Sequence, residues 1–328
     1  MKLLLLLPFL PLFFQNGQYK TIGSIDRIDK SLDAILKKEA TIEIIAEGFE
    51  WSEGPLWLKK QNMLLFSDIP TNTIYKWTES EGKEIYLTPS GYTGTRPRGE
   101  ELGSNALLLN KTGSLVICQH GNRQMAMMNT AIDNPQPSYK TIAGVYQSKK
   151  FNSPNDAVYR KNGDLFFTDP PYGLEKNMDD PLKEIPFQGV YLVTTLGDVK
   201  LLTDTISRPN GIAFMPDEKT LLIANSDGEK PFIYSYHLGK DDSLIQPEIF
   251  CNAGLLPFEE KSGFDGIKVD RNGNVFASGP GGICIFNKSG KLLGRIKIPG
   301  RNSNCAFSED EKTLYITADM YVLRVKMR

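Results

Sequence analysis

The chain has 328 residues, and its 38 Lys and Arg almost balance its 39 Asp and Glu, so the formal net charge is −1. The basic residues are not clustered, which argues against a nucleic-acid partner, an integral membrane partner or a polybasic membrane-binding surface. Length and composition suit one globular domain.

The N-terminus resembles an export signal. Met1 and Lys2 precede an apolar run from Leu3 to Phe14. This run is too short for a comfortable transmembrane helix and suits the core of a signal peptide. We predict a signal peptide over residues 1–17, and hence a periplasmic or secreted protein. An uncleaved anchor is the alternative.

An N-terminal extension is expected to follow at residues 18–40. Within it, Ser24 to Ala40 is predicted to form a helix, because Ile25, Ile28, Leu32, Ile35 and Leu36 fall on one stripe. Ser24 is placed to cap its first turn. Residues 41–46 read as a strand that is expected to pair with strands from the C-terminus.

A short pattern then recurs six times, mostly at about 50-residue intervals. Each copy has a polar turn, a short apolar strand, a hairpin turn and a second apolar strand. The clearest copy runs from Phe151 to Gly173, with Asn162 and Gly163 in its hairpin turn. Four-stranded repeats of this length predict an all-β fold, a six-bladed β-propeller over residues 41–328.

The repeats place one oxygen-bearing side chain at the same point of each copy. If these positions are equivalent, the side chains line one mouth of the central channel, because the innermost strand of each blade faces it. Carboxylates and amide oxygens are hard ligands that suit Ca²⁺, Mg²⁺ or Mn²⁺. The six residues are Glu53, Asn105, Asn155, Asn210, Asp265 and Asn304.

These residues also admit a structural interpretation. Asn and Asp are common in tight turns, so Asn105 and Asn304 are interpreted first as turn or supporting residues. Glu53 is different, because a glutamate before Gly54 and Pro55 is an unusual turn choice. Burying its carboxylate without a partner would be costly, and a metal ion would supply that partner.

Three long loops are expected to shape access to the channel: Gly91–Gly103, Glu175–Pro186 and Leu255–Gly263. The first of them carries four charged side chains that either reach over the channel mouth or form a solvated connection between blades.

Cysteines and histidines narrow the chemistry. Cys118, Cys284 and Cys305 lie in apolar strand patterns and are predicted to be buried thiols. With only His120 and His237, a multi-histidine metal site is excluded, and neither accompanies a G-x-S-x-G elbow. His237 is interpreted as structural. His120 is left between a structural hydrogen bond and a role near the site.

Several spaced motifs resemble the senescence-marker-protein/gluconolactonase family, and in particular its bacterial gluconolactonase-type members. The motifs are Ser52–Trp57, Ser153–Asp156, Thr168–Gly173, Arg208–Ile212 and Asp265–Asp270. The resemblance implies one divalent metal ion in the channel, held by Glu53, Asn155, Asn210 and Asp265. Ca²⁺ is favoured, with Mg²⁺, Mn²⁺ or Zn²⁺ as alternatives. Ser153 departs from the animal members, which carry Arg there, so their sugar contacts are not carried over.

The resulting hypothesis is a metal-dependent sugar lactonase that hydrolyses an aldonolactone to the aldonic acid. Asp265 is the candidate general base, and a metal-bound hydroxide is the competing account. Asn105, Asn155, His120 and Tyr172 are candidate substrate-binding residues. Two alternatives stay open. One is hydrolysis of another lactone, an ester or an organophosphate, and the other is a non-catalytic propeller that binds a carbohydrate or a protein.

Overall fold

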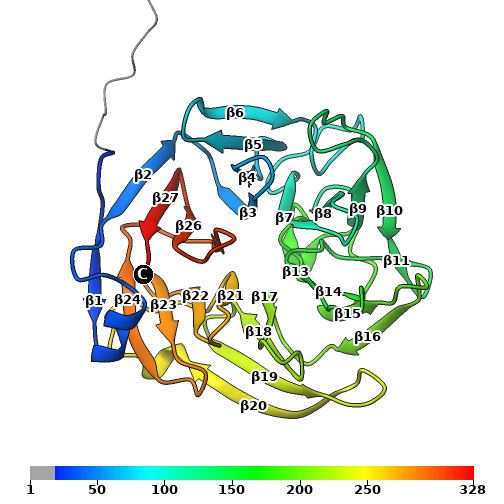
Figure 1. The fold of residues 1–328 in the computed structure, drawn as a ribbon. Helices are drawn as coiled ribbons and strands as arrows, with labels where there is room; N and C mark the ends of the chain where they lie inside the picture. Colours follow the sequence, from blue (N-terminus) through cyan, green and yellow to red (C-terminus); the bar gives the residue numbers. More distant parts are fainter. Residues whose placement is uncertain (1–18) are drawn as a thin grey trace, which may run out of the picture.

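The computed structural model describes residues 19–328, and the predicted signal peptide lies outside them. Six sheets of four or five strands surround a central channel (Figure 1). The six-bladed propeller expected from the repeats is therefore confirmed. Within the described residues, no helix is long and apolar enough to cross a membrane.

The strands of the first three blades, from the innermost outward, are β3 (Ser52–Leu58), β4 (Met63–Asp68), β5 (Thr73–Thr78) and β6 (Gly82–Leu87); β7 (Ser104–Leu109), β8 (Leu115–Gln119), β9 (Gln124–Met128) and β10 (Tyr139–Ala143); and β13 (Ala157–Tyr159), β14 (Leu165–Asp169), β15 (Gly189–Val193) and β16 (Val199–Thr203). A small hairpin lies between blades two and three in the sequence, formed by β11 (Val145–Tyr146) and β12 (Lys149–Lys150).

The strands of the last three blades are β17 (Pro209–Phe214), β18 (Thr220–Asn225), β19 (Phe232–Leu238) and β20 (Leu244–Asn252); β21 (Ile267–Val269), β22 (Val275–Gly279), β23 (Gly282–Phe286), β24 (Leu292–Lys297) and β1 (Ser24–Arg27); and β25 (Asn304–Phe307), β26 (Thr313–Ala318), β27 (Tyr321–Lys326) and β2 (Ile42–Glu47). Three 3-10 turns complete the described structure: η1 (Lys30–Ala34), η2 (Asn177–Asp179) and η3 (Ala253–Leu255).

The first hairpin of every blade turns through a residue with positive φ, as tight hairpin turns require. Gly163 has a φ of 105°, and glycine adopts this region without steric penalty. The other five turns use Asn62, Gly113, Glu218, Gly273 and Glu311. The six predicted hairpins are thus confirmed at one equivalent turn position.

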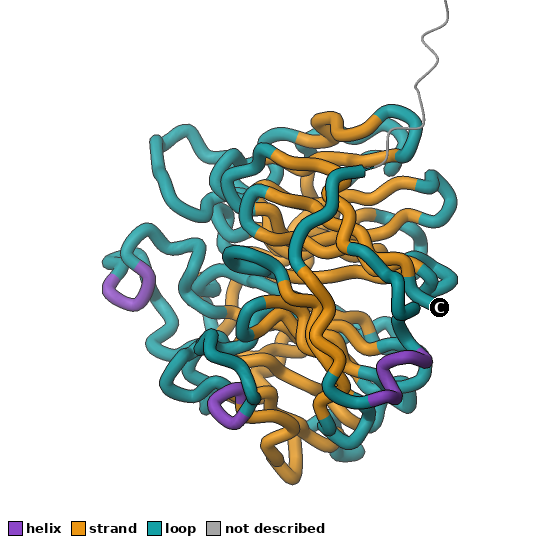
Figure 2. The backbone as a smooth tube through the Cα atoms, turned by 90° about the vertical axis from the view of Figure 1, so that its left-hand side faces the viewer, coloured by secondary structure: helices purple, strands orange, loops and turns teal. Residues whose placement is uncertain are grey.

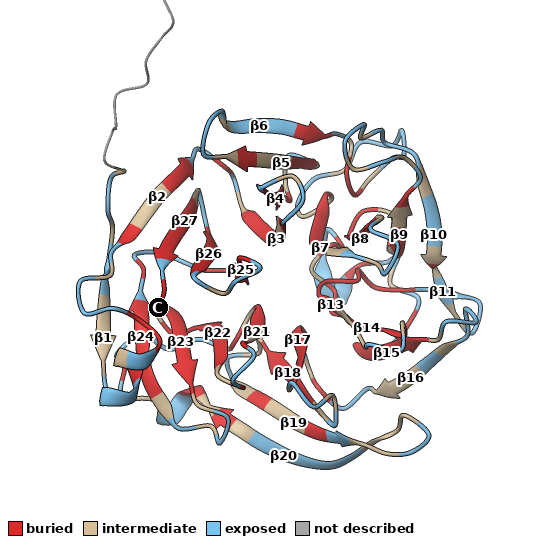
Figure 3. Ribbon diagram, in the orientation of Figure 1, coloured by how far each residue is buried: buried red, intermediate tan, exposed pale blue. Residues whose placement is uncertain are grey.

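The core lies between neighbouring blades, and the second strands of the blades are almost wholly buried (Figure 3). In one such interface, Phe166 of blade three packs edge-on against Phe214 of blade four, with ring centroids 5.0 Å apart. Each sheet therefore buries its two faces against its neighbours, which a single blade could not do alone.

The ring is closed by the two ends of the described chain. Strand β2 pairs antiparallel with β27, with Ile42 opposite Val325, so the sixth sheet contains both early and late residues. The Arg324 Nε donates to Glu43 Oε2 across 2.6 Å along this junction. The predicted pairing of residues 41–46 with the C-terminus is confirmed.

The predicted helix at Ser24–Ala40 is wrong. Ser24–Arg27 forms strand β1 on the outer edge of β24, and only the short 3-10 turn η1 follows it. Without β1, the N–H and C=O groups on this edge of β24 would have no strand partner, so tertiary pairing overrides local helical preference. The apolar stripe is still used, because Leu32 and Leu36 are buried in the core between blades five and six.

The longest loops gather on one face of the propeller. Seen from the side, two of the three 3-10 turns lie on that face, and the third lies near the C-terminus (Figure 2). The loops there are those that contain η2 and follow η3, which were predicted to shape access to the channel.

Candidate functional site

A cavity of about 520 Å³ opens at one mouth of the channel. Its wall contains five of the six oxygen-bearing residues that the repeats brought together: Glu53, Asn105, Asn155, Asn210 and Asp265. Each of them is either the second residue of an innermost strand or lies two residues before one. The expected ring is therefore present for these five residues, while Asn304 lies deeper and lines a different cavity.

Hydrogen bonds between blades hold this level of the channel together. Every one of the six blade interfaces carries at least one of them, so the backbone next to each site residue is fixed by the neighbouring blade. Going round the ring, they join Ser67 Oγ to Asn105 O, Ala106 N to Asn155 O, Thr168 Oγ1 to Asn210 O, Gly211 N to Asp265 O, Gly266 N to Ser303 O, and Ser303 Oγ to Ser52 O.

Glycines follow three of the site residues because the next blade approaches too closely for a side chain. A Cβ on Gly211, after Asn210, would lie 2.4 Å from the Asp265 carbonyl oxygen. A Cβ on Gly266, after Asp265, would lie 2.1 Å from Asn304 Cγ. Gly54, after Glu53, faces the next blade in the same way. These glycines allow the site residues to come together.

Glu53 is a buried carboxylate of this ring. Its side chain is 2% exposed. Burial, which disfavours the charged form, raises the pKa of Glu53 to about 8, and the nearby Asp156 carboxylate adds to the rise. Hydrogen bonds from Gly54 N and Asn304 Nδ2 to Oε2 lower the pKa only in part. These hydrogen bonds therefore do not offset the cost of burying the negative charge of Glu53.

Asp265 lines the same cavity, and its charged form is disfavoured for the same reason. Burial raises the pKa of Asp265 well above its ordinary value, and the negative charges of Glu53, Glu101 and Asp156 raise it further. A hydrogen bond from Asn210 lowers this pKa in part. Two carboxylates that share one cavity and repel each other would both be stabilised in the charged form by a cation between them.

The amide groups point to the same conclusion. The Oδ1 atoms of Asn105 and Asn210 are buried and have no hydrogen-bond partner among the described residues. Such unpaired acceptors are costly inside a protein. Two carboxylates and free amide oxygens form a hard-oxygen donor set that fits Ca²⁺, Mg²⁺ or Mn²⁺. In residues 19–328, no cluster of three His, Cys, Asp or Glu side chains could hold a metal alone.

His120 lies behind the cavity wall and does not line it. Its Nε2 is 3.3 Å from Asn105 Nδ2, and its Nδ1 is 3.4 Å from Glu101 Oε2. With Nδ1 protonated, the ring accepts from the Asn105 amide, which leaves Asn105 Oδ1 without a hydrogen-bond partner among the described residues. The structure thus connects His120 to the site through Asn105.

Residues from loops also line the cavity. Tyr172 lines the cavity, where its hydroxyl hydrogen bonds to the Ser226 hydroxyl and burial raises the pKa of Tyr172. Glu101 reaches the cavity from the 91–103 loop, which Arg98 ties down by donating to the Gly121 and Gly173 carbonyl oxygens. The 255–263 loop contributes four residues, including Glu260.

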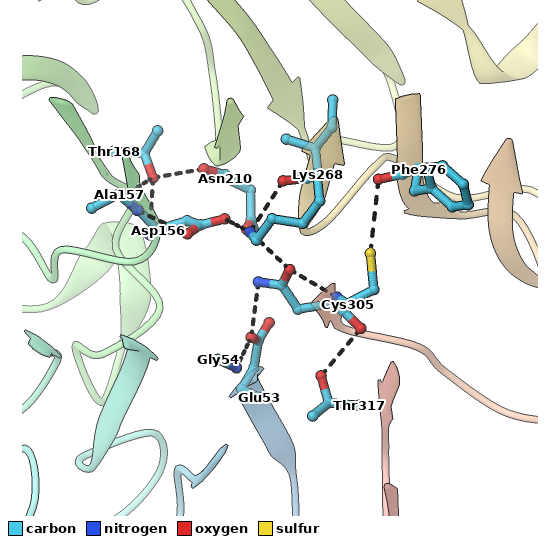
Figure 4. A network of polar contacts seen from close by, with 12 residues as sticks. Glu53, Gly54, Asp156, Ala157, Thr168, Asn210, Lys268, Phe276, Cys305 and Thr317 are labelled. Carbon is cyan, nitrogen blue, oxygen red and sulfur yellow. Dashed lines mark hydrogen bonds and ion pairs between the residues drawn. The ribbon is translucent and has the colours of Figure 1, made fainter. Parts of the chain in front are cut away.

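No role was predicted for Lys268 and Asp156, which line a second cavity beneath the ring. Their side chains meet close to Glu53 and Asn210 (Figure 4). The Lys268 Nζ lies 3.2 Å from Asp156 Oδ2, although the residues come from blades five and three. One signal was available in the sequence. Lys268 interrupts the three-residue apolar strand Ile267–Val269, and a lysine on an innermost strand needs a partner.

All four cysteines are buried and free, which confirms the predicted buried thiols and leaves no disulfide between Cys284 and Cys305. His237 lies on β19, the third strand of blade four, with its side chain exposed and away from the cavity.

Fold and site together define a class: six-bladed propellers with a carboxylate and amide ring in the channel mouth. The chain belongs to the SMP-30/Gluconolactonase/LRE-like family, whose sequence model matches residues 51–319. It is 40% identical to a gluconolactonase of Zymomonas mobilis subsp. mobilis, over 95% of this chain and 88% of that protein. It is 28% identical to the lactonase drp35 of Staphylococcus aureus, over 89% and 83% of the two chains.

A solved structure of a gluconolactonase from Xanthomonas campestris has the same architecture. It superposes with a TM-score of 0.81 at 26% identity, and the match covers 96% of this chain and 99% of that one.

Proposed function

We propose that the protein is a sugar lactonase of the gluconolactonase type, which opens an aldonolactone by hydrolysis and depends on one divalent metal ion. One observation carries this proposal. Two buried carboxylates, Glu53 and Asp265, face a solvent-open cavity together with amide oxygens that have no partner among the described residues. Family membership and the relatives named gluconolactonase and lactonase support the reaction class.

The metal ion would be held by Glu53, Asn155, Asn210 and Asp265, which all line the cavity. When bound, such an ion supplies positive charge that stabilises the negative charge developing on the lactone carbonyl oxygen. The donor set favours Ca²⁺, with Mg²⁺, Mn²⁺ or Zn²⁺ as alternatives.

Asp265 is the proposed general base. Its carboxylate takes a proton from water as the water oxygen bonds to the lactone carbonyl carbon. When the ring C–O bond breaks, the ring oxygen leaves with the bonding electrons and takes up a proton, which Asp265 returns. The products are the open-chain acid and a regenerated Asp265 carboxylate.

The substrate hydroxyls would be bound by the polar side chains of the wall. Asn105 offers an unpaired Oδ1. Tyr172 offers a hydroxyl already oriented by Ser226, and Asn155 lines the cavity beside them. His120 would act indirectly, by holding the Asn105 amide in one orientation. This polar lining suits a sugar better than an apolar ester.

Export is part of the proposal. The apolar run Leu3–Phe14 would be removed with the rest of a signal peptide over residues 1–17, placing the mature protein in the periplasm or outside the cell. N-terminal sequencing of the protein recovered from a cell-free culture supernatant or periplasmic extract tests it. A mature protein that still begins at Met1 would contradict the proposal.

The reaction class is tested with a substrate panel measured at one pH in a pH-stat, each against a no-enzyme control. The panel contains glucono-1,5-lactone, dihydrocoumarin, 4-nitrophenyl acetate and paraoxon. The proposal expects the highest kcat/KM for the sugar lactone. A clear preference for the aromatic lactone, the ester or the organophosphate would contradict the sugar lactone as substrate. No turnover of any substrate by folded protein would favour a binding role.

A further inference from the structure

The layer beneath the ring contains an ammonium group whose donors are all in use. The Lys268 Nζ donates to Ile267 O at 3.1 Å, Asp156 Oδ2 at 3.2 Å and Asn304 Oδ1 at 3.2 Å (Figure 4). A protonated lysine has three N–H donors and no acceptor, so this set saturates it. The ammonium is therefore held at one place rather than left to sample solvent.

Asn304 connects this cation to the site. Its Oδ1 accepts from Lys268 Nζ and also from Cys305 N at 2.9 Å, and its Nδ2 lies 3.3 Å from Glu53 Oε2. A flipped amide would place its NH₂ group against the ammonium and its oxygen against the Glu53 carboxylate. Both contacts would be repulsive, so Lys268, together with the Cys305 N–H, determines which end of the Asn304 amide faces Glu53.

The consequence reaches the carboxylate itself. The hydrogen bonds that the described residues give to Glu53, from Gly54 N and Asn304 Nδ2, both reach Oε2. Holding this oxygen from below fixes the rotation of the carboxylate and leaves Oε1 for the cavity. The positive charge of Lys268 also lowers the pKa of Glu53, against the larger effect of burial.

Lys268 acts from outside the cavity that Glu53 lines. Together with Asp156 and Asn304, it lines a separate cavity of about 480 Å³ at the other end of the channel. The walls of that second cavity are largely apolar and include Trp57, Phe214 and Phe307. A change at Lys268 therefore removes no side chain that lines the substrate cavity.

We propose that Lys268 is a positioning residue for the metal-binding carboxylate, and that it works through the amide of Asn304 on Glu53. The inference rests on the divalent site of the proposed function. Residues that orient a metal ligand typically contribute ten- to a hundredfold in metal affinity. Lys268 would have an effect of this size although it faces away from the substrate cavity.

The test measures calcium binding to chelator-treated protein by isothermal titration calorimetry. Lys268→Met keeps the length of the side chain and removes the donors, and it is expected to weaken the apparent affinity about tenfold or more. Lys76→Met is the matched control, since both lysine side chains are 29% exposed and both pair with a carboxylate. Lys76 lies on β5, and this variant is expected to bind calcium like the wild type.

A double-mutant cycle with Asn304→Ser then separates an effect of Lys268 that passes through Asn304 from a direct effect of its positive charge on Glu53. If Lys268 works through Asn304, the double variant binds calcium no more weakly than the weaker single variant. Additive losses, or an unchanged affinity in Lys268→Met, would overturn the inference. If Lys268→Met does not fold, Asn304→Ser alone must show the loss, and an unchanged affinity there overturns it too. No calcium binding by the wild type would instead overturn the metal site, and the inference with it.

Discussion

The Asn304 amide of the last blade donates to the Glu53 carboxylate of the first blade across 3.3 Å. These residues are 251 positions apart, and they meet only because β2 and β27 close the ring. The orientation of the Glu53 carboxylate therefore depends on closure of the whole propeller. Binding of a cation at Glu53 should accordingly stabilise the complete fold and not one blade.

Calcium is expected to raise the melting temperature of the wild-type protein. At a hundred times the dissociation constant, a ligand that binds only the folded state adds about 2.7 kcal/mol to the free energy of unfolding. Glu53→Gln should lose most of this gain, because the neutral amide no longer supplies a charged ligand. Differential scanning calorimetry with and without calcium measures it. Glu84→Gln, at a more exposed carboxylate, is the control. Equal calcium stabilisation of wild type and Glu53→Gln would contradict the site.

Asp265→Asn is expected to lower kcat about 10²- to 10⁴-fold at saturating metal, the usual contribution of a general base. Initial rates of glucono-1,5-lactone hydrolysis measure the effect, after calorimetry has shown that metal still saturates the variant. Asp198→Asn, an exposed aspartate in the loop between β15 and β16, should retain the wild-type rate. Full activity of Asp265→Asn would remove Asp265 as the base.

Gly211→Ala should be destabilising, since its Cβ would lie 2.4 Å from the Asp265 carbonyl oxygen. Overpacking of this kind typically costs about 1–3 kcal/mol. Activity should also fall, because the backbone of Asp265 must move. Gly228→Ala is the control, since nothing lies within 4 Å of a Cβ there. Chemical denaturation measures the free energy of unfolding of both variants. Equal values for Gly211→Ala and Gly228→Ala would show that the contact between blades four and five has room for a methyl group.

The buried carboxyl group of Asp169 should make the free energy of unfolding depend on pH. It is fully buried and accepts hydrogen bonds from Asn152 N and Ser153 N, each at 2.7 Å. Burial raises the pKa of Asp169 from 3.8 to about 7, because the charged form is poorly solvated. A raised pKa means that the folded state binds the proton more tightly than the unfolded state.

The stability contributed by Asp169 is therefore complete below pH 4 and is lost as the pH rises to 7. The shift in pKa corresponds to about 4 kcal/mol of the free energy of unfolding. Urea denaturation at pH 5 and pH 8 should show a smaller difference for Asp169→Asn than for the wild type. An identical difference in both proteins would show that Asp169 titrates normally.

The sequence predicted the parts of the fold that depend on local pattern. Hairpins such as the one around Gly163 were found because strand, turn and strand lie within about 20 residues. The helix expected at Ser24–Ala40 was wrong because its outcome depends on the open edge of β24, some 270 residues later. No local pattern reveals that edge.

The site was predictable to the same degree. Glu53, Asn105, Asn155, Asn210 and Asp265 occupy equivalent points of a repeat, so their meeting in one cavity followed from the repeat itself. The contact of Lys268 with Asp156 joins blades three and five across 112 residues and breaks the equivalence. It depends on side chains of different repeats meeting beneath the ring, which only the assembled propeller determines.

The central claim is that a cation held by Glu53 and Asp265 is required for lactone hydrolysis. The most direct measurement is the rate of glucono-1,5-lactone hydrolysis by chelator-treated protein, followed in a pH-stat and corrected for spontaneous opening. We predict that turnover falls to the no-enzyme rate and returns when Ca²⁺, Mg²⁺, Mn²⁺ or Zn²⁺ is added back, with Ca²⁺ most effective. An unchanged rate in protein shown by elemental analysis to be free of metal would contradict the claim.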